Sequence, residues 1–231
     1  MKEKLTCLKW FDILILTLIM FGEGIYNSTL QYIALTNQTT TLEENLTFSS
    51  FQNYQALVIQ SIWLLLAFLY LVFRNFDFSV WTRHIKLEKW LAVKVISLFL
   101  ISALAMDLYS LISYNLSPLT PSLSQIFPKI DLSLLLYSLL NGFYEEIFFL
   151  GVCLTFKPQY IKWTFLYSLI IRCSFHTYQG LGNALALGLL LGSIFFICYQ
   201  KWKPQNLLPF FLAHALADIF GLTILTYLFY Y

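Results

Sequence analysis

Charged residues are scarce in this sequence: Asp, Glu, Lys and Arg make up 11% of its 231 residues, against about 25% in an average soluble domain. This shortage excludes an ordinary soluble globular protein. The formal net charge is only +2, and the charges are scattered in small groups, so no nucleic-acid partner is predicted. Hydrophobic residues make up 59% of the chain and fall in long blocks, which indicates a protein that crosses a membrane several times.

Cysteine is also scarce. The four cysteines share no C-x-x-C spacing, and the last three lie within apolar blocks, so neither a disulfide framework nor a cysteine zinc site is predicted. We expect all four to be buried thiols: Cys7, Cys153, Cys173 and Cys198.

Seven stretches come close to the roughly 20 apolar residues that a spanning helix needs. The six prolines all lie between these stretches or in a first turn, where a missing amide hydrogen is harmless. The predicted fold is therefore an all-α transmembrane bundle of about seven spans. These run from Trp10 to Tyr26, Leu57 to Phe73, Val95 to Tyr114, Leu132 to Phe156, Trp163 to Thr177, Leu181 to Tyr199, and Leu207 to Tyr231.

The basic residues predict the orientation of the bundle, because cytoplasmic loops hold an excess of Lys and Arg. All but two of the 14 Lys and Arg residues precede the first stretch or lie in alternate loops; the two exceptions are Lys129 and Arg172. This places the N-terminus inside and the C-terminus outside. Residues 27–55 contain Glu43 and Glu44 but no basic residue, and their polar composition predicts a mobile, peripheral external loop.

Nine ionisable residues fall at membrane depth, where each costs a few kcal/mol unless it is functional or paired. Asp12, Glu23 and Asp107 lie near span ends or stand alone, and we expect them to be hydrogen-bonded structural carboxylates. The other six gather on three predicted helices of the C-terminal half. They are Glu145, Glu146, Arg172, His176, His214 and Asp218.

The spacing of these residues is informative, because residues four apart share a helical face. Arg172 precedes His176 by four positions. His214 and Asp218 have the same separation, so the carboxylate is expected beside the imidazole.

Glu145 and Glu146 are adjacent and therefore lie about 100° apart on a helix, so at most one can point straight into a shared cavity. The other needs a partner. Arg172 is the only basic residue within a predicted span.

Acid-base chemistry suits this set. A carboxylate in apolar surroundings can take a proton from water near neutral pH and return it. Two imidazoles can orient that water and donate hydrogen bonds to an oxyanion, which makes peptide hydrolysis a candidate reaction. Two other interpretations stay open: a proton-coupled transporter, since carboxylates and histidines also line proton relays, and buried pairs that only fix helix register.

Three separated motifs carry a resemblance to a known family. Asn141 to Gly151, Phe175 to Gly180 and His214 to Asp218 resemble, in the same order, the motifs of the CPBP family, the CAAX and bacteriocin-processing intramembrane proteases also called the Abi family. The resemblance covers roughly residues 130 to 231. We therefore divide the chain into N-terminal spans, residues 1–130, and a CPBP-like core, residues 131–231.

The resemblance implies an intramembrane endopeptidase that cleaves a peptide or lipidated peptide. Glu145 would activate the water together with His176, and His214 would stabilise the oxyanion while Asp218 holds it. Glu146 would be structural. A zinc ion on Glu145, His176 and His214 stays open as a second mechanism, although we favour none. The family also leaves open a non-catalytic bacteriocin-immunity membrane protein, and we expect a bacterial plasma membrane with membrane lipid as its surroundings.

The chain departs from the family pattern in its first motif. Leu150 stands where the family usually has an arginine, and Arg172 stands four residues before His176, where the family often has phenylalanine. We predict that Arg172 supplies the missing positive charge from the next helix and pairs with Glu146. Counting 1.5 Å per residue places Glu145 and His214 in the cytoplasmic half of the membrane and His176 nearer the outer face.

Overall fold

The structure is a computed structural model that describes residues 3–46, 48–113 and 130–229, and its regular elements in these ranges are all helices. Four helices are long and apolar enough to cross a membrane: α1 (Trp10–Thr36), α3 (Ser50–Phe73), α5 (Leu91–Ser113) and the continuous helix Leu181–Lys201. The last comprises α9 (Leu181–Leu185), the π-helical η4 (Ala186–Leu191) and α10 (Gly192–Lys201). The all-α transmembrane prediction is confirmed to that extent.

The remaining elements are shorter. α7 (Leu132–Glu146) continues as the π-helical η1 (Ile147–Val152), and α8 (Ile161–Phe175) and α11 (Leu208–Phe220) complete the set that carries the predicted site. Seven spans and their orientation stay predictions; Lys129 and the predicted span ends Tyr114 and Tyr231 lie outside the described residues. The short elements are α2 (Leu42–Leu46), α4 (Ser79–Thr82), η2 (Pro158–Tyr160), η3 (Thr177–Gln179) and α12 (Leu225–Phe229).

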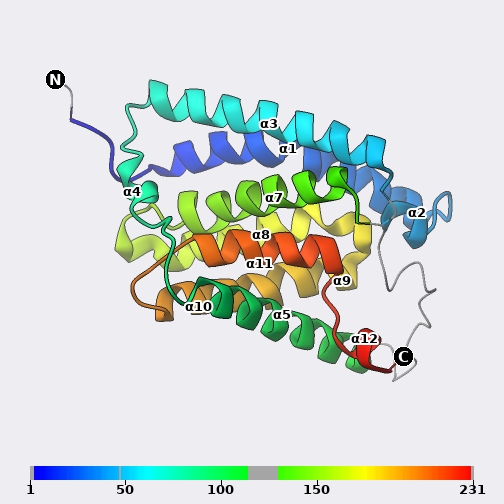
Figure 1. The fold of residues 1–231 in the computed structure, drawn as a ribbon. Coiled ribbons are helices and arrows are strands. Elements are labelled where there is room, and N and C mark those ends of the chain that lie inside the picture. Colours follow the sequence, from blue (N-terminus) through cyan, green and yellow to red (C-terminus); the bar gives the residue numbers. More distant parts are fainter. Residues whose placement is uncertain (1–2, 47, 114–129, 230–231) are drawn as a thin grey trace.

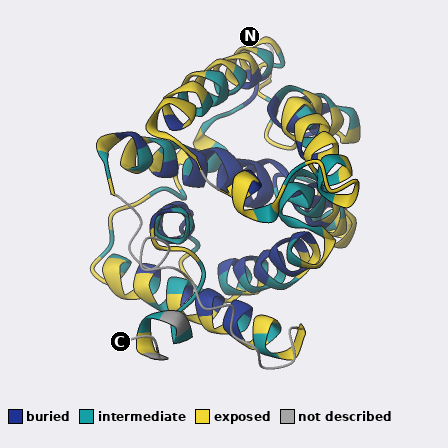
Figure 2. Cartoon of the chain, turned by 90° about the vertical axis from the view of Figure 1, so that its right-hand side faces the viewer, coloured by how far each residue is buried: buried dark blue, intermediate teal, exposed yellow. Residues whose placement is uncertain are grey.

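The main helices lie roughly side by side (Figure 1), and their successive contacts form a closed ring. α7 packs against α3 on one side and α11 on the other, and α11 packs against α5. η4 joins α5 to α8, and α1 closes the ring by contacting both α8 and α3. Exposed residues face outward from α1 and α3, whereas buried residues face the interior of the bundle (Figure 2).

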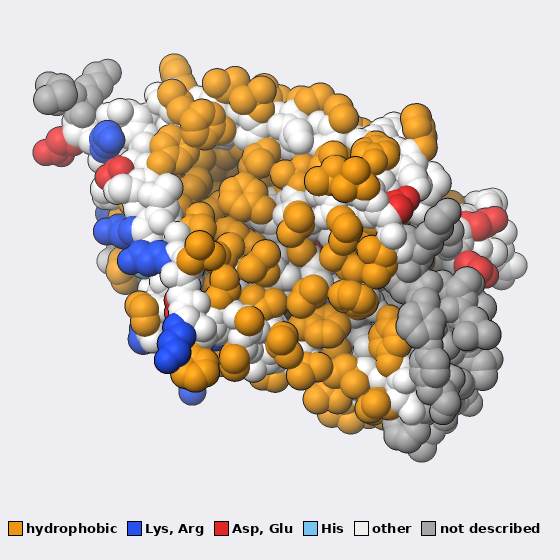
Figure 3. Space-filling view, in the orientation of Figure 1, with side chains coloured by type: hydrophobic (Ala, Val, Ile, Leu, Met, Phe, Trp, Pro, Cys, Tyr) orange, Lys and Arg blue, Asp and Glu red, His pale blue; other side chains and the backbone are white. Residues whose placement is uncertain are grey.

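The outer surface is apolar, as a lipid-facing surface must be. α3 exposes Val58, Ile62, Leu65 and Leu69, and hydrophobic side chains cover most of the face in Figure 3. Lys and Arg side chains on that face gather at the end of the bundle where α4 lies. This distribution agrees with the predicted cytoplasmic position of that end.

The loop expected at residues 27–55 is too long, because helices cover most of the described part of this segment. α1 continues to Thr36, α2 follows, and α3 begins at Ser50 with Ser49 as its N-cap. Asn45 of α2 donates a hydrogen bond to the Tyr178 carbonyl at 3.1 Å. Tertiary contacts of this kind outweigh the low helix propensity of Asn and Thr.

The prediction of a single helix from Leu207 to Tyr231 is also wrong, because the described part of this segment contains two helices. α11 has 13 residues and ends before Gly221, which adopts φ 75°, a conformation that glycine tolerates. Beyond it, Asp107 of α5 accepts hydrogen bonds from the backbone amides of Ile224 and Leu225 at 2.7 and 3.0 Å. Hydrogen bonds to Asp107 therefore tie the chain after α11 to α5, beside a break that the sequence signals only by one glycine.

The three isolated carboxylates are hydrogen-bonded, as predicted. Asp107 holds the start of α12, and Asp12 binds Arg74 at 2.6 Å. Glu23 accepts a hydrogen bond from the Trp63 indole at 2.7 Å.

The prediction of four buried thiols is only partly right. Cys153 is buried and Cys173 and Cys198 are half-buried. Cys7 is exposed, because it lies before α1 rather than inside the bundle. All four are free thiols.

Candidate active site

Two close helix contacts bring the predicted site residues together. A Cβ atom at Gly142 of α7 would lie 2.4 Å from the Phe211 carbonyl oxygen of α11, so only glycine allows this approach of the two backbones. A Cβ atom at Gly188 of η4 would lie 2.1 Å from the Cys173 sulfur of α8. The first contact holds α7 against α11, which carries His214, and the second holds η4 against α8, which precedes His176.

Glu146 is the centre of a buried ion-pair network. Nη2 of Arg172 donates to both carboxylate oxygens of Glu146 at 2.9 Å, so the predicted pairing is present. On its other side, Oε1 of Glu146 is 2.7 Å from Nδ1 of His214. The Arg172 guanidinium also lies 4.0 Å from the centre of the Phe149 ring, and this contact stabilises a cation. Glu146 thus links the two helices α8 and α11.

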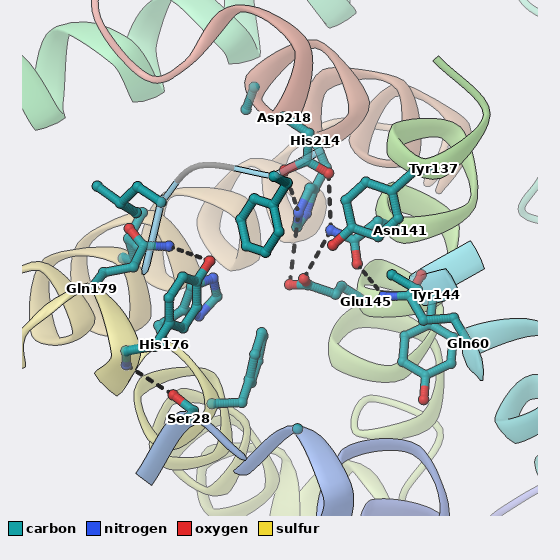
Figure 4. Close-up of a pocket in the computed structure, with 18 of the residues that line it drawn as sticks. Ser28, Gln60, Tyr137, Asn141, Tyr144, Glu145, His176, Gln179, His214 and Asp218 are labelled. Carbon is teal, nitrogen blue, oxygen red and sulfur yellow. Dashed lines mark hydrogen bonds and ion pairs between the residues drawn. The ribbon is translucent and has the colours of Figure 1, made fainter. Parts of the chain in front are cut away.

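Glu145 presents a free oxygen to the cavity. Its Oε1 accepts a hydrogen bond from Asn141 at 3.1 Å, whereas its buried Oε2 has no hydrogen-bond partner among the described residues. Oε2 lies 3.7 Å from Nε2 of His214 and 3.9 Å from Nη1 of Arg172. Figure 4 shows the carboxylate between His214 and Asn141. An unpartnered buried oxygen of this kind can accept a hydrogen bond from a water or a substrate.

The His214 imidazole is hydrogen-bonded to a different carboxylate than expected. Asp218 was predicted to hold this imidazole, but its Oδ1 lies 3.7 Å from Nε2 of His214. Its Oδ2 instead accepts from Asn141 at 2.9 Å. Glu146 reaches Nδ1 from α7, a contact that spacing along α11 alone does not reveal.

Asn141 and Gln60 are site residues that the sequence analysis did not single out. Asn141 donates to both Glu145 and Asp218, and its own Oδ1 accepts from Gln60 at 2.7 Å. The sequence could have indicated Asn141, because it precedes Glu145 by one helical turn and therefore lies on the same helical face. Gln60 lies alone in an apolar span, and its partner on α7 is visible only in the fold.

His176 lies across the cavity from Glu145 (Figure 4). Its Nδ1 lies 2.8 Å from the Arg172 carbonyl oxygen, so Nδ1 donates and Nε2 stays available. The turn after His176 is anchored to α1, because Ser28 accepts a hydrogen bond from the Tyr178 amide at 2.9 Å. The segment once expected to be a loop therefore positions this histidine.

The four predicted catalytic residues line one cavity of about 1230 Å³. Glu145 comes from α7, His176 from the end of α8, and His214 and Asp218 from α11. Arg172 also reaches the cavity, whereas Glu146 lies behind its wall. His176 follows the end of α8 at Phe175 and lines the same cavity as Glu145 and His214, while the depth of each residue in a membrane stays a prediction.

The donor set does not fit a divalent metal ion well. Within the described ranges, the side chains whose ligand atoms lie within 4.8 Å of one another are Glu145, Glu146 and His214, without His176. Both oxygens of Glu146 already bind Arg172, and Oε1 also binds His214. A guanidinium in contact with one ligand and 3.9 Å from another repels a second cation.

Comparison with known families identifies this part of the chain. Residues 128–220 match the model of the Rce1-like family, described as type II CAAX prenyl endopeptidase Rce1-like. This is the CPBP family, so the resemblance is confirmed over residues 128–220. No curated protein and no solved structure matches the chain. The family and the four apolar helices together identify an integral membrane protein.

Proposed function

We propose that this CPBP-family chain is an intramembrane endopeptidase that hydrolyses a peptide bond in a peptide or lipidated peptide. The observation that carries the proposal is the buried Oε2 of Glu145, which has no hydrogen-bond partner within the described ranges and faces a cavity shared with two histidines. A general base must lie within hydrogen-bond reach of the water that it activates. The free oxygen meets that requirement for a water in the cavity.

Glu145 acts as the general base and then as the general acid. It takes a proton from the attacking water while the water oxygen bonds to the carbonyl carbon, and it later gives the proton to the leaving amine. Asn141 fixes the other oxygen of the carboxylate at 3.1 Å. The reacting oxygen is therefore held in one orientation.

His214 stabilises the oxyanion. Its Nδ1 donates to Glu146 at 2.7 Å, and this carboxylate favours a positively charged imidazolium. Nε2, which lies 3.7 Å from Glu145, then donates to the carbonyl oxygen as negative charge develops on it. Asp218 acts on this site through Asn141 rather than by binding the imidazole directly.

His176 orients the attacking water from the opposite wall. Because its Nδ1 donates to the Arg172 carbonyl, Nε2 of the neutral ring is an acceptor for a water proton. The mechanism uses no metal ion, in line with the poor fit of Glu145, Glu146 and His214 to a divalent cation.

The test is cleavage of quenched peptides, with and without a prenyl group, by the purified protein in liposomes. We expect cleavage by the wild type and its loss in Glu145→Gln and in His214→Ala. The matched controls are Glu88→Gln and His84→Ala, whose side chains lie outside the cavity and which should cleave normally.

The same experiment separates the other functions. An immunity protein that works by binding would tolerate Glu145→Gln in a protection assay. A transporter would move protons without producing peptide fragments. Fragments that persist in Glu145→Gln would contradict the proposal.

A further inference from the structure

The charge of the cavity bears on which peptides it accepts. Four carboxylates line it, on Glu23, Asp131, Glu145 and Asp218, whereas Arg172 is the only Lys or Arg among the described lining residues. Arg172 is already bound to Glu146 behind the wall. The His214 imidazolium lies 3.7 Å from both Glu145 and Asp218, so the lining carboxylates without an ion-pair partner among the described residues are Glu23 and Asp131. Low-dielectric walls focus the field of such charges.

Neutral groups, not cations, supply the hydrogen bonds that these carboxylates receive. Glu23 accepts from the Trp63 indole at 2.7 Å, and Asp218 accepts from the Asn141 amide at 2.9 Å. Carboxylates at membrane depth are costly without a cation or water. A positively charged ligand would lower that cost.

Asp131 is ionised at the other end of the cavity. It caps α7 and accepts hydrogen bonds from the Ser133 and Ser50 hydroxyls and the Leu134 amide, which lower the pKa of its carboxyl to about 2. Its charge is therefore present throughout the working range of pH.

Two further features of the wall point to a polar, cationic ligand. Ser102 is only 2% exposed, lines the cavity, and has a hydroxyl oxygen without a hydrogen-bond partner among the described residues. The rings of Trp63, Tyr137 and Tyr178 also line the cavity, and aromatic faces attract ammonium and guanidinium groups.

Helix register gives the spacing of the carboxylates along the cavity. The Gln60 amide donates to Asn141 at 2.7 Å, and the Trp63 indole, one turn further along α3, donates to Glu23 at 2.7 Å, so Glu23 lies at about the level of Glu145. Asp131 precedes Glu145 on α7 by about 21 Å, counting 1.5 Å per residue. An extended peptide covers that length in about six residues.

We propose that the cavity selects peptides with a Lys or Arg within about six residues of the scissile bond, and that Glu23 and Asp131 bind the basic side chain. This inference rests on the proposed protease function and names its substrate class.

The test uses a peptide that the wild type cleaves, in which one position at a time is either lysine or the uncharged norleucine. Liposomes of phosphatidylcholine exclude attraction by anionic lipid. We expect kcat/KM to be at least about fivefold higher for lysine at one or more positions. The preference should fall towards unity in Glu23→Gln with Asp131→Asn, mainly through KM.

Glu23→Gln keeps an acceptor for the Trp63 indole. Asp131→Asn keeps the N-cap acceptor for the Leu134 amide and the Ser133 hydroxyl, and the Ser50 hydroxyl can accept from the new amide nitrogen instead of donating. The control Asp77→Asn removes a carboxylate that does not line the cavity and should keep the full preference. Equal cleavage of the lysine and norleucine peptides overturns the inference. If that cleavage still requires Glu145, the proposed protease function is unaffected.

If the folded wild type cleaves no peptide at all, prenylated or not, the proposed protease function fails. Binding of a fluorescent lysine peptide and of its norleucine counterpart to the wild type then tests the preference for positive charge without cleavage. Tighter binding of the lysine peptide than of the norleucine peptide supports a cation-selective cavity, and equal binding overturns it.

Discussion

Replacing Arg172 with methionine tests how the buried network is held together. Methionine fills much of the same volume against Phe149 but removes the cation that donates to both oxygens of Glu146. Glu146 is 0% exposed, so it would remain as a buried carboxylate without its cation. Removing one partner of a buried ion pair costs about 3–5 kcal/mol.

For a chain of this size about 1 kcal/mol corresponds to roughly 2–4 °C in Tm. We therefore expect Tm of Arg172→Met to fall by about 6–20 °C, measured by thermal unfolding in detergent. Adding Glu146→Gln removes the orphaned charge while keeping an acceptor for His214, so the double variant should recover much of the loss.

Two outcomes would refute this reasoning. One is a Tm of Arg172→Met within about 2 °C of the wild type, because about 1 kcal/mol is too little for a broken buried pair. The other is a double variant as unstable as Arg172→Met alone, which would mean that the lost stability comes from packing on Phe149 and not from the charge.

Three further outcomes follow from the site. Gly142→Ala places a methyl group 2.4 Å from the Phe211 carbonyl, so it should abolish cleavage and lower Tm, whereas Gly22→Ala, with open space around it, should do neither; equal effects would contradict the close contact. Asn141→Leu should reduce kcat at least about tenfold with little change in KM, because Glu145 loses its orienting bond; unchanged kcat would exclude that role. Incubation with a chelator should leave the cleavage rate unchanged, and inactivation that zinc reverses would contradict a metal-free mechanism.

The sequence predicted the helical bundle because long apolar blocks leave few other structures in a membrane. The prediction from sequence was wrong where the local composition favours one structure and tertiary contacts stabilise another. Residues 27–36 read as loop because they are rich in Asn, Thr and Gln, yet Ser28 is buried against the turn after His176. Gly221 ends α11 in a stretch whose hydropathy gives no sign of a break.

The contacts within the site were likewise predictable only where they do not depend on the packing of distant helices. The pairing of Arg172 with Glu146 was predictable, because one cation and two adjacent carboxylates leave few combinations in an apolar bundle. The bond from Glu146 to His214 was not, because it depends on the close approach of α7 and α11 at Gly142.

The most direct test of the central claim is the single-turnover rate of peptide cleavage by Glu145→Gln beside the wild type, both folded in the same liposomes. Glutamine keeps the shape and an acceptor for Asn141 but cannot take a proton from water. A general base contributes about 10²–10⁴-fold to the rate, so the account predicts a loss of at least about 100-fold. A variant that cleaves within about tenfold of the wild type would show that Glu145 is not the base.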